Sequence, residues 1–254
     1  MGIRPGLCSV TFRQLDPAAL VAVAADAGLQ AIEWGGDVHV PAGDTARATE
    51  VARITADAGL AVCSYGSYFR AGAGERIAPV LDAAQALGAD RVRVWAGRTG
   101  SADATGTERA AVIDALADAA AQAGARGIRL ALEFHGGTLA DDAAQTLRVL
   151  DEVGSAHLCT YWQPTVAAPD DVAVAEYRRM SDHVAAVHVF SWWPTVERCP
   201  LPARDGLWRA FAAAAAAVPV RPRDALLEFV PGDDPAALAA EATALRRYLV
   251  AEAV

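Results

Sequence analysis

Residues 125–135 read ARGIRLALEFH, and the fold can be worked out from this stretch. Gly127 closes an alanine-rich helical segment in the manner of a left-handed C-cap, and an apolar run of strand type follows at once. The same order of helix, glycine and strand recurs around Gly28, Gly59 and Gly88. Alternation of this kind is typical of repeated βα units built around a parallel sheet.

Eight strand-like runs can be placed along the chain. They occupy Gly6–Phe12, Gln30–Gly35, Ala61–Gly66, Arg91–Ala96, Arg129–His135, His157–Trp162, Val184–Ser191 and Ala225–Val230. Eight units in 254 residues, without a glycine-rich dinucleotide turn after the first strand, favour a closed single (β/α)8 TIM barrel over a doubly wound open sheet. The regular spacing leaves no linker, so we expect residues 1–254 to form one domain.

Composition excludes several classes of function. The net charge of −9 argues against nucleic acid as a partner, because such binding depends on basic side chains at phosphates. We expect a cytoplasmic protein with no membrane partner, because no apolar run is long enough for a span and no signal peptide is evident. All 22 basic residues are arginine, which excludes Schiff-base chemistry on a lysine amine. A homo-oligomer is left open.

Polar residues interrupt three of the apolar strands. The fifth strand ends with Glu133 and His135, which share a face because they are two residues apart. His188 and Glu228 stand among apolar neighbours in the seventh and eighth strands. A carboxylate at such a place is costly to bury unless it shares a cation or a proton. A single buried Glu is as readily explained by an arginine partner, but three converging groups favour a divalent metal, Mn²⁺ or Mg²⁺.

These residues resemble the metal ligands of the xylose-isomerase-like barrels, the superfamily of sugar phosphate isomerases/epimerases. The resemblance extends over essentially the whole chain and includes residues 31–36, 64–68 and 92–97. It implies a metal-dependent sugar isomerase or epimerase of carbohydrate metabolism, acting on a small ketose-like or hydroxy-carbonyl substrate. By resemblance, Glu133 and Glu228 are both metal ligands and the catalytic pair that moves a proton through a metal-stabilised enediolate. No organic cofactor is expected.

The sixth strand departs from the pattern of this family. An Asp normally supplies the fourth ligand there, whereas residues 159–164 read CTYWQP. Gln163 is the nearest polar side chain, so the expected metal ligands are Glu133, Gln163, His188 and Glu228. An amide in place of a carboxylate removes one negative charge, and the affinity for Mn²⁺, Mg²⁺ or Co²⁺ should be weaker. Xylose isomerases proper also use a lysine, which is absent here, so an epimerase or an enediolate-type isomerase fits better than a hydride shift.

Several other residues are candidates for binding the substrate. His135 would contact substrate hydroxyls or orient Glu133, and Arg198 would reach a substrate oxygen or carboxylate from the loop after the seventh strand. Aromatic faces at a barrel mouth suit the C–H faces of a sugar. The full set of expected substrate contacts is His135, Arg198, Glu33, His39, Trp95 and Trp162.

Two alternative functions remain open at this level. A dehydratase or other lyase would use the same metal and base to remove a proton next to a carbonyl and expel water from a keto-polyol. A catalytically degenerate barrel that only binds a ligand would explain the missing Asp. Metal content separates the classes, because an enzyme of this kind should retain about one divalent ion per chain.

Overall fold

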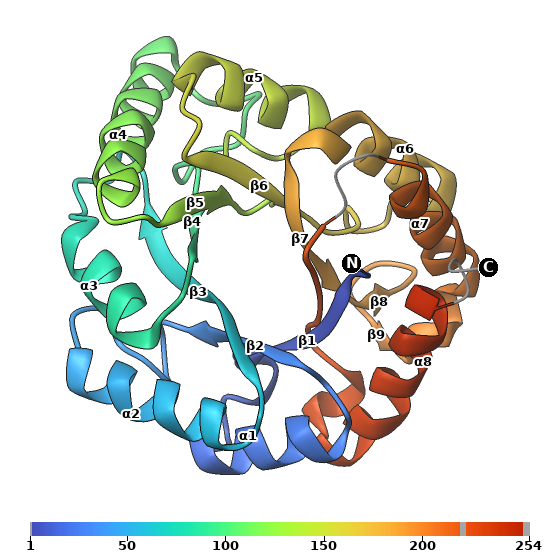
Figure 1. The fold of residues 1–254 in the computed structure, drawn as a ribbon. Coiled ribbons are helices and arrows are strands. Elements are labelled where there is room, and N and C mark those ends of the chain that lie inside the picture. The colour runs from blue at the N-terminus through green and yellow to red at the C-terminus, as the bar shows by residue number, and fades with distance from the viewer. Residues whose placement is uncertain (1, 219–221, 251–254) are drawn as a thin grey trace.

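Eight parallel strands close into a barrel in the computed structural model, which describes residues 2–218 and 222–250 (Figure 1). Around the barrel the order is β1-β10-β7-β6-β5-β4-β3-β2. The numbers β8 and β9 belong to a separate hairpin. Each barrel strand pairs with the barrel strands before and after it in the chain, and β10, the last, pairs with β1. The expected single (β/α)8 barrel is thereby confirmed. The strands are β1 Arg4–Cys8, β2 Ala31–Gly35, β3 Ala61–Arg70, β4 Arg91–Trp95, β5 Arg129–Leu132, β6 Leu158–Trp162, β7 Val184–Val189 and β10 Asp224–Leu227.

In the described residues, eight α-helices surround the strands and form the outer ring of Figure 1. Asp16 and Asp44 cap the first two helices, since their side chains accept hydrogen bonds from backbone N–H groups of the first turn. The fifth helix is capped by Asp142 after residues 136–141 have formed a turn. The helices are α1 Pro17–Asp26, α2 Thr45–Asp57, α3 Ala78–Leu87, α4 Gly106–Gly124, α5 Ala143–Val153, α6 Asp170–Met180, α7 Asp205–Ala217 and α8 Leu238–Val250.

Several strands end earlier than the sequence pattern indicated. β1 stops at Cys8, and a 3-10 turn, Ser9–Phe12, completes the apolar run. β5 and β10 stop one residue before Glu133 and Glu228. The backbone N–H of Glu133 nevertheless donates to the carbonyl of Val94, and that of Glu228 donates to the carbonyl of Val189. The backbone of both residues is therefore anchored to the neighbouring strand at the edge of the barrel.

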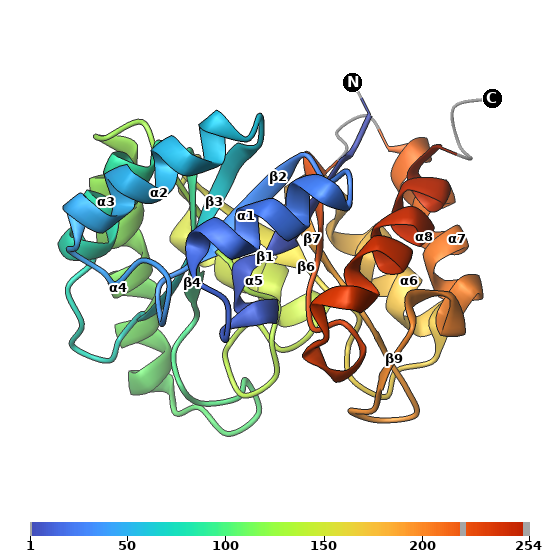
Figure 2. The ribbon, with the colours of Figure 1, turned by 90° about the horizontal axis from the view of Figure 1, so that it is seen from below.

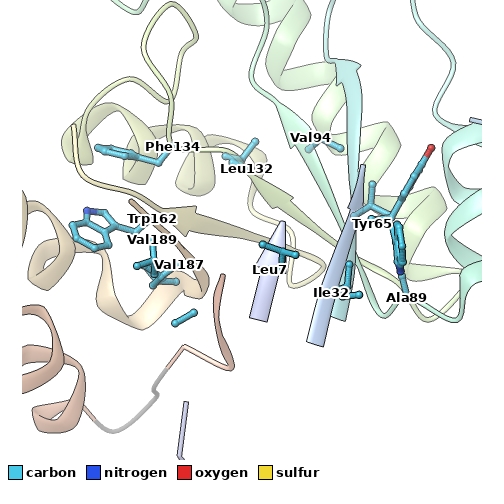
Figure 3. Packing of buried hydrophobic residues seen from close by; sticks show 14 of the residues in the cluster. Leu7, Ile32, Tyr65, Ala89, Val94, Leu132, Phe134, Trp162, Val187 and Val189 are labelled. Carbon is cyan, nitrogen blue, oxygen red and sulfur yellow. The ribbon is translucent and has the colours of Figure 1, made fainter. Parts of the chain in front are cut away.

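Side chains alternate along each strand between the helices and the interior of the barrel. Figure 3 shows one part of the outer layer, where Leu7, Ile32, Val94 and Leu132 belong to the large core under the helices. The residues between them point inward, because successive side chains of a strand face opposite sides. On β4 this alternation puts Val92 and Val94 in the outer core and turns the arginines between and before them inward.

Small side chains fill most of the barrel interior. The inner cluster is Cys8, Val10, Ala31, Cys63, Ala131, Cys159, Tyr161, Ala185, Ala186 and Leu226. At the amino-terminal end of the strands, Arg91 and Asp224 form a fully buried ion pair, and Arg4 binds the second oxygen of the same carboxylate at 2.7 Å. This end of the barrel is thus closed by paired charges, which leaves the other end for a cavity.

A short hairpin, β8 Ser191–Trp192 with β9 Arg198–Cys199, extends beyond β7. Figure 2 views the barrel from the side, with β9 at the end opposite the start of β1. The hairpin therefore belongs to the rim formed by the carboxyl ends of the strands. None of the helices in the described part of the chain is both long and apolar enough to cross a membrane.

Gly6 on β1 tests how tightly the strands pack. A Cβ at this position would lie 2.6 Å from Cδ2 of Leu226 and 2.7 Å from the carbonyl oxygen of Ala31. Because the second contact is with backbone, we expect Gly6→Ala to lower the free energy of unfolding by about 1–3 kcal/mol in urea denaturation. Gly106→Ala is the control, because its Cβ would meet nothing within 4 Å. Equal stability of the two variants would contradict tight packing at Gly6.

Candidate functional site

A cavity of about 370 Å³ opens at the carboxyl ends of the strands. Its size falls in the range of sites that hold small ligands. The lining residues lie on or just after seven of the eight barrel strands, all except β2, so the cavity depends on the closed barrel rather than on one segment. The lining is Val10, Arg13, Tyr68, Arg93, Trp95, Glu133, Phe134, His135, Gly136, Asp141, Gln163, Pro164, Thr165, Val166, Phe190, Trp192, Glu228 and Phe229.

Arg93 lies at the floor of this cavity between two carboxylates. Its Nη1 is 3.0 Å from Oε2 of Glu133, and its Nε is 3.7 Å from Oε1 of Glu33. All three side chains are buried, with at most 4% of each residue exposed. The contact with Glu133 is an ion pair without hydrogen-bond geometry, since Oε2 of Glu133 has no hydrogen-bond partner in the described residues. Its attraction is therefore mainly that of two opposite charges in a poorly solvated place.

His188 of β7 lies between Glu33 on one side and Gln163 and Glu228 on the other. Its Nδ1 lies 3.1 Å from Oε1 of Gln163 and 3.5 Å from Oε2 of Glu228. Its Nε2 faces Oε1 of Glu33 at 3.4 Å, and Ser64 donates a hydrogen bond to the other oxygen of that carboxylate at 2.8 Å. A proton on Nε2 would be attracted to Glu33 and would leave the lone pair of Nδ1 directed toward Gln163 and Glu228.

The pKa values of these groups reflect their burial and their neighbours. Burial raises the pKa of Glu33, but Arg93, His188 and Ser64 outweigh it and lower that pKa to about 2. For His188, burial lowers the pKa, whereas Glu228 and Glu33 raise it further than burial lowers it. Burial raises the pKa of Glu228, and the nearby Glu133 adds to this effect. Perturbed groups gathered in one cleft are typical of a functional site.

The donor atoms around Nδ1 of His188 fit a divalent cation. Two ligands at right angles, each about 2.1 Å from Mg²⁺, are about 3.0 Å apart. The distances of 3.1 Å to Gln163 and 3.5 Å to Glu228 are close to that spacing. The set also offers one imidazole and several oxygens, which suits Mn²⁺ as well as Mg²⁺. This donor set, together with the hydrogen-bond-free oxygen of Glu133, can therefore hold a metal ion.

A second group of donors lies deeper in the barrel. Ligand atoms of Cys8, Glu33 and His188 lie within 4.8 Å of one another, whereas the expected trio of Glu133, His188 and Glu228 is spread more widely. Because His188 and Glu228 are only 3.5 Å apart, it is Glu133 whose ligand atoms lie more than 4.8 Å from at least one of the other two. Burial and Glu33 raise the pKa of the Cys8 thiol well above its ordinary value, which disfavours the thiolate that binds metals.

Aromatic side chains form two walls of the cavity. Trp95 and His135 lie with ring centroids 4.5 Å apart, and the guanidinium of Arg70 covers the Trp95 ring at 3.9 Å. On the other side, the ring centroids of Trp192 and Phe229 are 5.5 Å apart. The cavity therefore combines a charged floor with apolar, flat walls, an arrangement that suits a small ligand with both hydroxyl groups and C–H faces.

The expected substrate contacts lie in different places. His135 and Trp95 line the cavity. Arg198 stands just behind the wall, ion-paired with Asp233 and with its guanidinium 4.6 Å from the centre of the Phe229 ring.

The other three expected contacts are outside the cavity lining. Glu33 lies beneath the floor with Arg93 and His188. His39 is buried between the hydroxyl of Ser9 and the carbonyl of Leu15. Trp162 faces the helices, stacked on Phe211 with centroids 5.3 Å apart.

The sequence reasoning did not single out Arg93. The signal was available, because the run Arg91-Val92-Arg93-Val94 puts a charge at every second position of a strand that otherwise reads as buried. Arg13 and Tyr68, which bond to each other and to Asp37 at the cavity rim, were also missed. They come from loops and strand ends with no repeating pattern.

Comparisons with known proteins agree with this architecture. A family model described as xylose isomerase-like TIM barrel matches residues 21–248. A search of proteins with curated function gives no match.

Among solved structures, the probable 3-DHS dehydratase AsbF from Bacillus anthracis has a TM-score of 0.79 at 17% identity, covering 96% of this chain and 99% of that one. A D-psicose 3-epimerase has a TM-score of 0.72 at 13% identity, covering 98% and 99%. The 3-keto-D-glucoside 4-epimerase YcjR from E. coli has a TM-score of 0.73 at 16% identity, covering 96% and 99%. At identities this low the likeness shows the fold.

The acid sensitivity of the protein should depend on Glu33. Because the pKa of Glu33 in the folded protein, about 2, lies below its ordinary value of 4.5, the ionised carboxylate stabilises the fold above about pH 4.5. That contribution is lost as the pH falls toward 2. We expect Glu33→Gln to be less stable than wild type at neutral pH but to lose less stability between about pH 5 and pH 2 in urea denaturation. Ser64→Ala should reduce the acid loss only in part, and parallel profiles for wild type and Glu33→Gln would contradict the ion-paired state of Glu33.

Proposed function

The chain belongs to the xylose isomerase-like TIM barrel family, and on that premise we propose that it is a metal-dependent isomerase or epimerase of a small ketose-like or hydroxy-carbonyl compound. The observation that carries the proposal is the gathering of Glu133, His188, Glu228 and Gln163 at one end of the barrel. Three of these four residues line the cavity, where a substrate would reach them. Buried ion pairs that serve stability alone seldom leave carboxylates at a cavity floor.

A divalent cation, held by His188, Gln163, Glu228 and Glu133, would draw electron density from the carbonyl and the neighbouring hydroxyl oxygen of the substrate and make the C–H of the hydroxyl-bearing carbon more acidic. The two glutamates would then transfer the proton of that carbon. Glu133 and Glu228 come from β5 and β10 ends that lie on different sides of the barrel, so one can remove a proton and the other return one. Glutamine variants of Glu133 and Glu228 distinguish which of the two removes the proton.

The residues around this pair are suited to exclude water. Only 4% of each of the two glutamates is exposed, and His188 is fully buried. Charges interact more strongly in such a site than in bulk water, and a reactive intermediate is protected from side reactions. The walls of Trp95 and Trp192 would pack on C–H groups of the substrate while its hydroxyl groups face the polar floor.

A dehydratase acting on a cyclic keto-polyol is the second candidate. The aromatic walls favour it, because a six-membered ring that loses water becomes flatter and packs better on an aromatic face. The structural similarity to a probable 3-DHS dehydratase is compatible with the same idea. Both candidates begin with removal of a proton next to a carbonyl, so the same glutamates would serve.

Gln163 provides a test of the metal ligands. If its amide oxygen is the fourth ligand, Gln163→Asp should bind Mn²⁺ about tenfold more tightly because it adds a negative charge, and Gln163→Leu should bind it more weakly. Affinity is measured by titration calorimetry on metal-free protein. Unchanged affinity in both variants would show that Gln163 is no ligand, and an absence of Mn²⁺, Mg²⁺ or Co²⁺ binding in the wild type would contradict metal dependence altogether.

Glutamine variants of the two glutamates test the proton transfer. Glu133→Gln and Glu228→Gln keep the shape of the side chain but remove its base, so turnover should fall by about 10²–10⁴-fold. In D₂O with D-fructose and related ketoses, the wild type should bring deuterium into the carbon next to the carbonyl, and the variant lacking the abstracting Glu should not. In H₂O, mass spectrometry separates the candidates, since the product of an isomerase or epimerase has the mass of the substrate and that of a dehydratase has lost one water.

A control for these variants is Glu241→Gln. Glu241 is also buried, but it accepts a hydrogen bond from the backbone N–H of Leu201 and lies outside the cavity lining. It should retain full exchange. If Glu133→Gln and Glu228→Gln exchange as fast as this control, the proton is moved by other groups and the proposed mechanism is wrong.

A further inference from the structure

We propose that Arg93 is a built-in counter-cation that holds Glu133 away from the other metal ligands and thereby weakens the binding of the divalent ion. The inference deepens the proposed function and rests on it for the metal site. It assigns Arg93 as a positioning residue, because its guanidinium acts through a carboxylate ligand.

The first support is the placement of Glu133. Its Oε2 lies 3.0 Å from Nη1 of Arg93, whereas Glu133, His188 and Glu228 do not form a group with ligand atoms all within 4.8 Å, although His188 and Glu228 are 3.5 Å apart. Because the contact lacks hydrogen-bond geometry, little besides opposite charge keeps Glu133 at this place. A carboxylate held in this way is available to a stronger cation.

The second support is that the interior of the barrel is shaped around the guanidinium. Gly66 of β3 faces it, and a Cβ there would lie 3.2 Å from Nη2 of Arg93 and 2.9 Å from Oε1 of Glu33. Any other residue would press on this ion pair. On the cavity side the ring of Tyr68 lies 6.0 Å from the guanidinium carbon. Arg93 is thus enclosed, and its charge is poorly screened by water.

The balance of charge at the site gives the third support. Three buried carboxylates, Glu33, Glu133 and Glu228, face one guanidinium. An imidazole that ligates a metal is neutral, so with His188 as a ligand two negative charges remain, which a single divalent ion would offset. Removing the charge of Arg93 would leave three negative charges and would also free Glu133 to join the other ligands. Both effects favour tighter metal binding, whereas damage to the fold would weaken it.

The experiment measures Mn²⁺ affinity of metal-free protein without substrate, by titration calorimetry and by the loss of the free Mn²⁺ signal in electron paramagnetic resonance. We expect Arg93→Met to bind Mn²⁺ at least about tenfold more tightly than wild type, and Arg93→Lys, which keeps the charge, to stay near the wild-type affinity. Arg13→Met is the matched control, because Arg13 lines the same cavity but is partly exposed and paired with Asp37. It should change the affinity by less than about twofold.

Each outcome decides between the inference and the proposed function. If wild type binds Mn²⁺ and Arg93→Met binds it equally or more weakly, the inference is overturned and the metal site stands. If wild type does not bind and Arg93→Met does, Arg93 replaces the metal in this chain, which supports the inference and contradicts metal-dependent activity. If neither binds, both are wrong.

A second comparison covers the case in which Arg93→Met does not fold because it leaves Glu33 and Glu133 without a cation. In the Glu33→Gln background only Glu133 loses its partner. The double variant Arg93→Met/Glu33→Gln should then bind Mn²⁺ at least about tenfold more tightly than Glu33→Gln alone. Equal or weaker binding by the double variant would overturn the inference.

Discussion

The buried contact of Arg93 with Glu33 and Glu133 is the interaction on which the centre of the barrel depends. Charges at such a depth lose most of their hydration, and a carboxylate left there without a cation would cost several kcal/mol. Pairing with the guanidinium offsets that cost. Nε of Arg93 and Oε2 of Glu133 have no hydrogen-bond partner in the described residues, so the pairing depends on the attraction of opposite charges.

This constraint explains how the rest of the site is arranged. Because Glu33 is held by Arg93 and Ser64, it is a fixed negative charge beside Nε2 of His188. The other nitrogen of His188 is then turned toward Gln163 and Glu228 at the cavity floor. An imidazole oriented by a carboxylate on one side and offered to a cation on the other is a common arrangement at metal sites. The charged layer lies directly beneath the aromatic walls, so polar and apolar parts of a ligand have separate places to bind.

The two ends of the barrel use buried charge differently. At the amino-terminal end, Arg91 and Arg4 surround Asp224, and the charges are satisfied there by short contacts that fill the interior. At the carboxyl-terminal end, negative groups outnumber Arg93, and a cavity adjoins them. The first arrangement is that of a structural ion pair, and the second is that of a site ready to receive a cation or a polar ligand. Both lie along β4, whose Arg91 and Arg93 are two residues apart and point into the same interior.

The sequence by itself determined the repeat of strand and helix, the closed barrel and the strand ends at which Glu133, His188 and Glu228 would be found. Each of these follows from local rules, namely the period of apolar residues, the glycines that end helices and the cost of burying charge. Trp162 shows where such rules stop. It ends a strand like Trp95, yet it faces the helices, because one residue along a strand reverses the side to which a side chain points.

Only the tertiary structure decided which charges neutralise one another. Arg93, Glu33 and Glu133 come from three strands that are separated by dozens of residues, and nothing in the order of the chain pairs them. Closure of the barrel brings their inward positions to one level, and the space left by Gly66 admits the guanidinium. Contacts of this kind depend on the register between distant strands and on the volume left between them. A local sequence pattern contains information on neither the register nor this volume. The role of Arg93 was therefore recognised only in the folded structure.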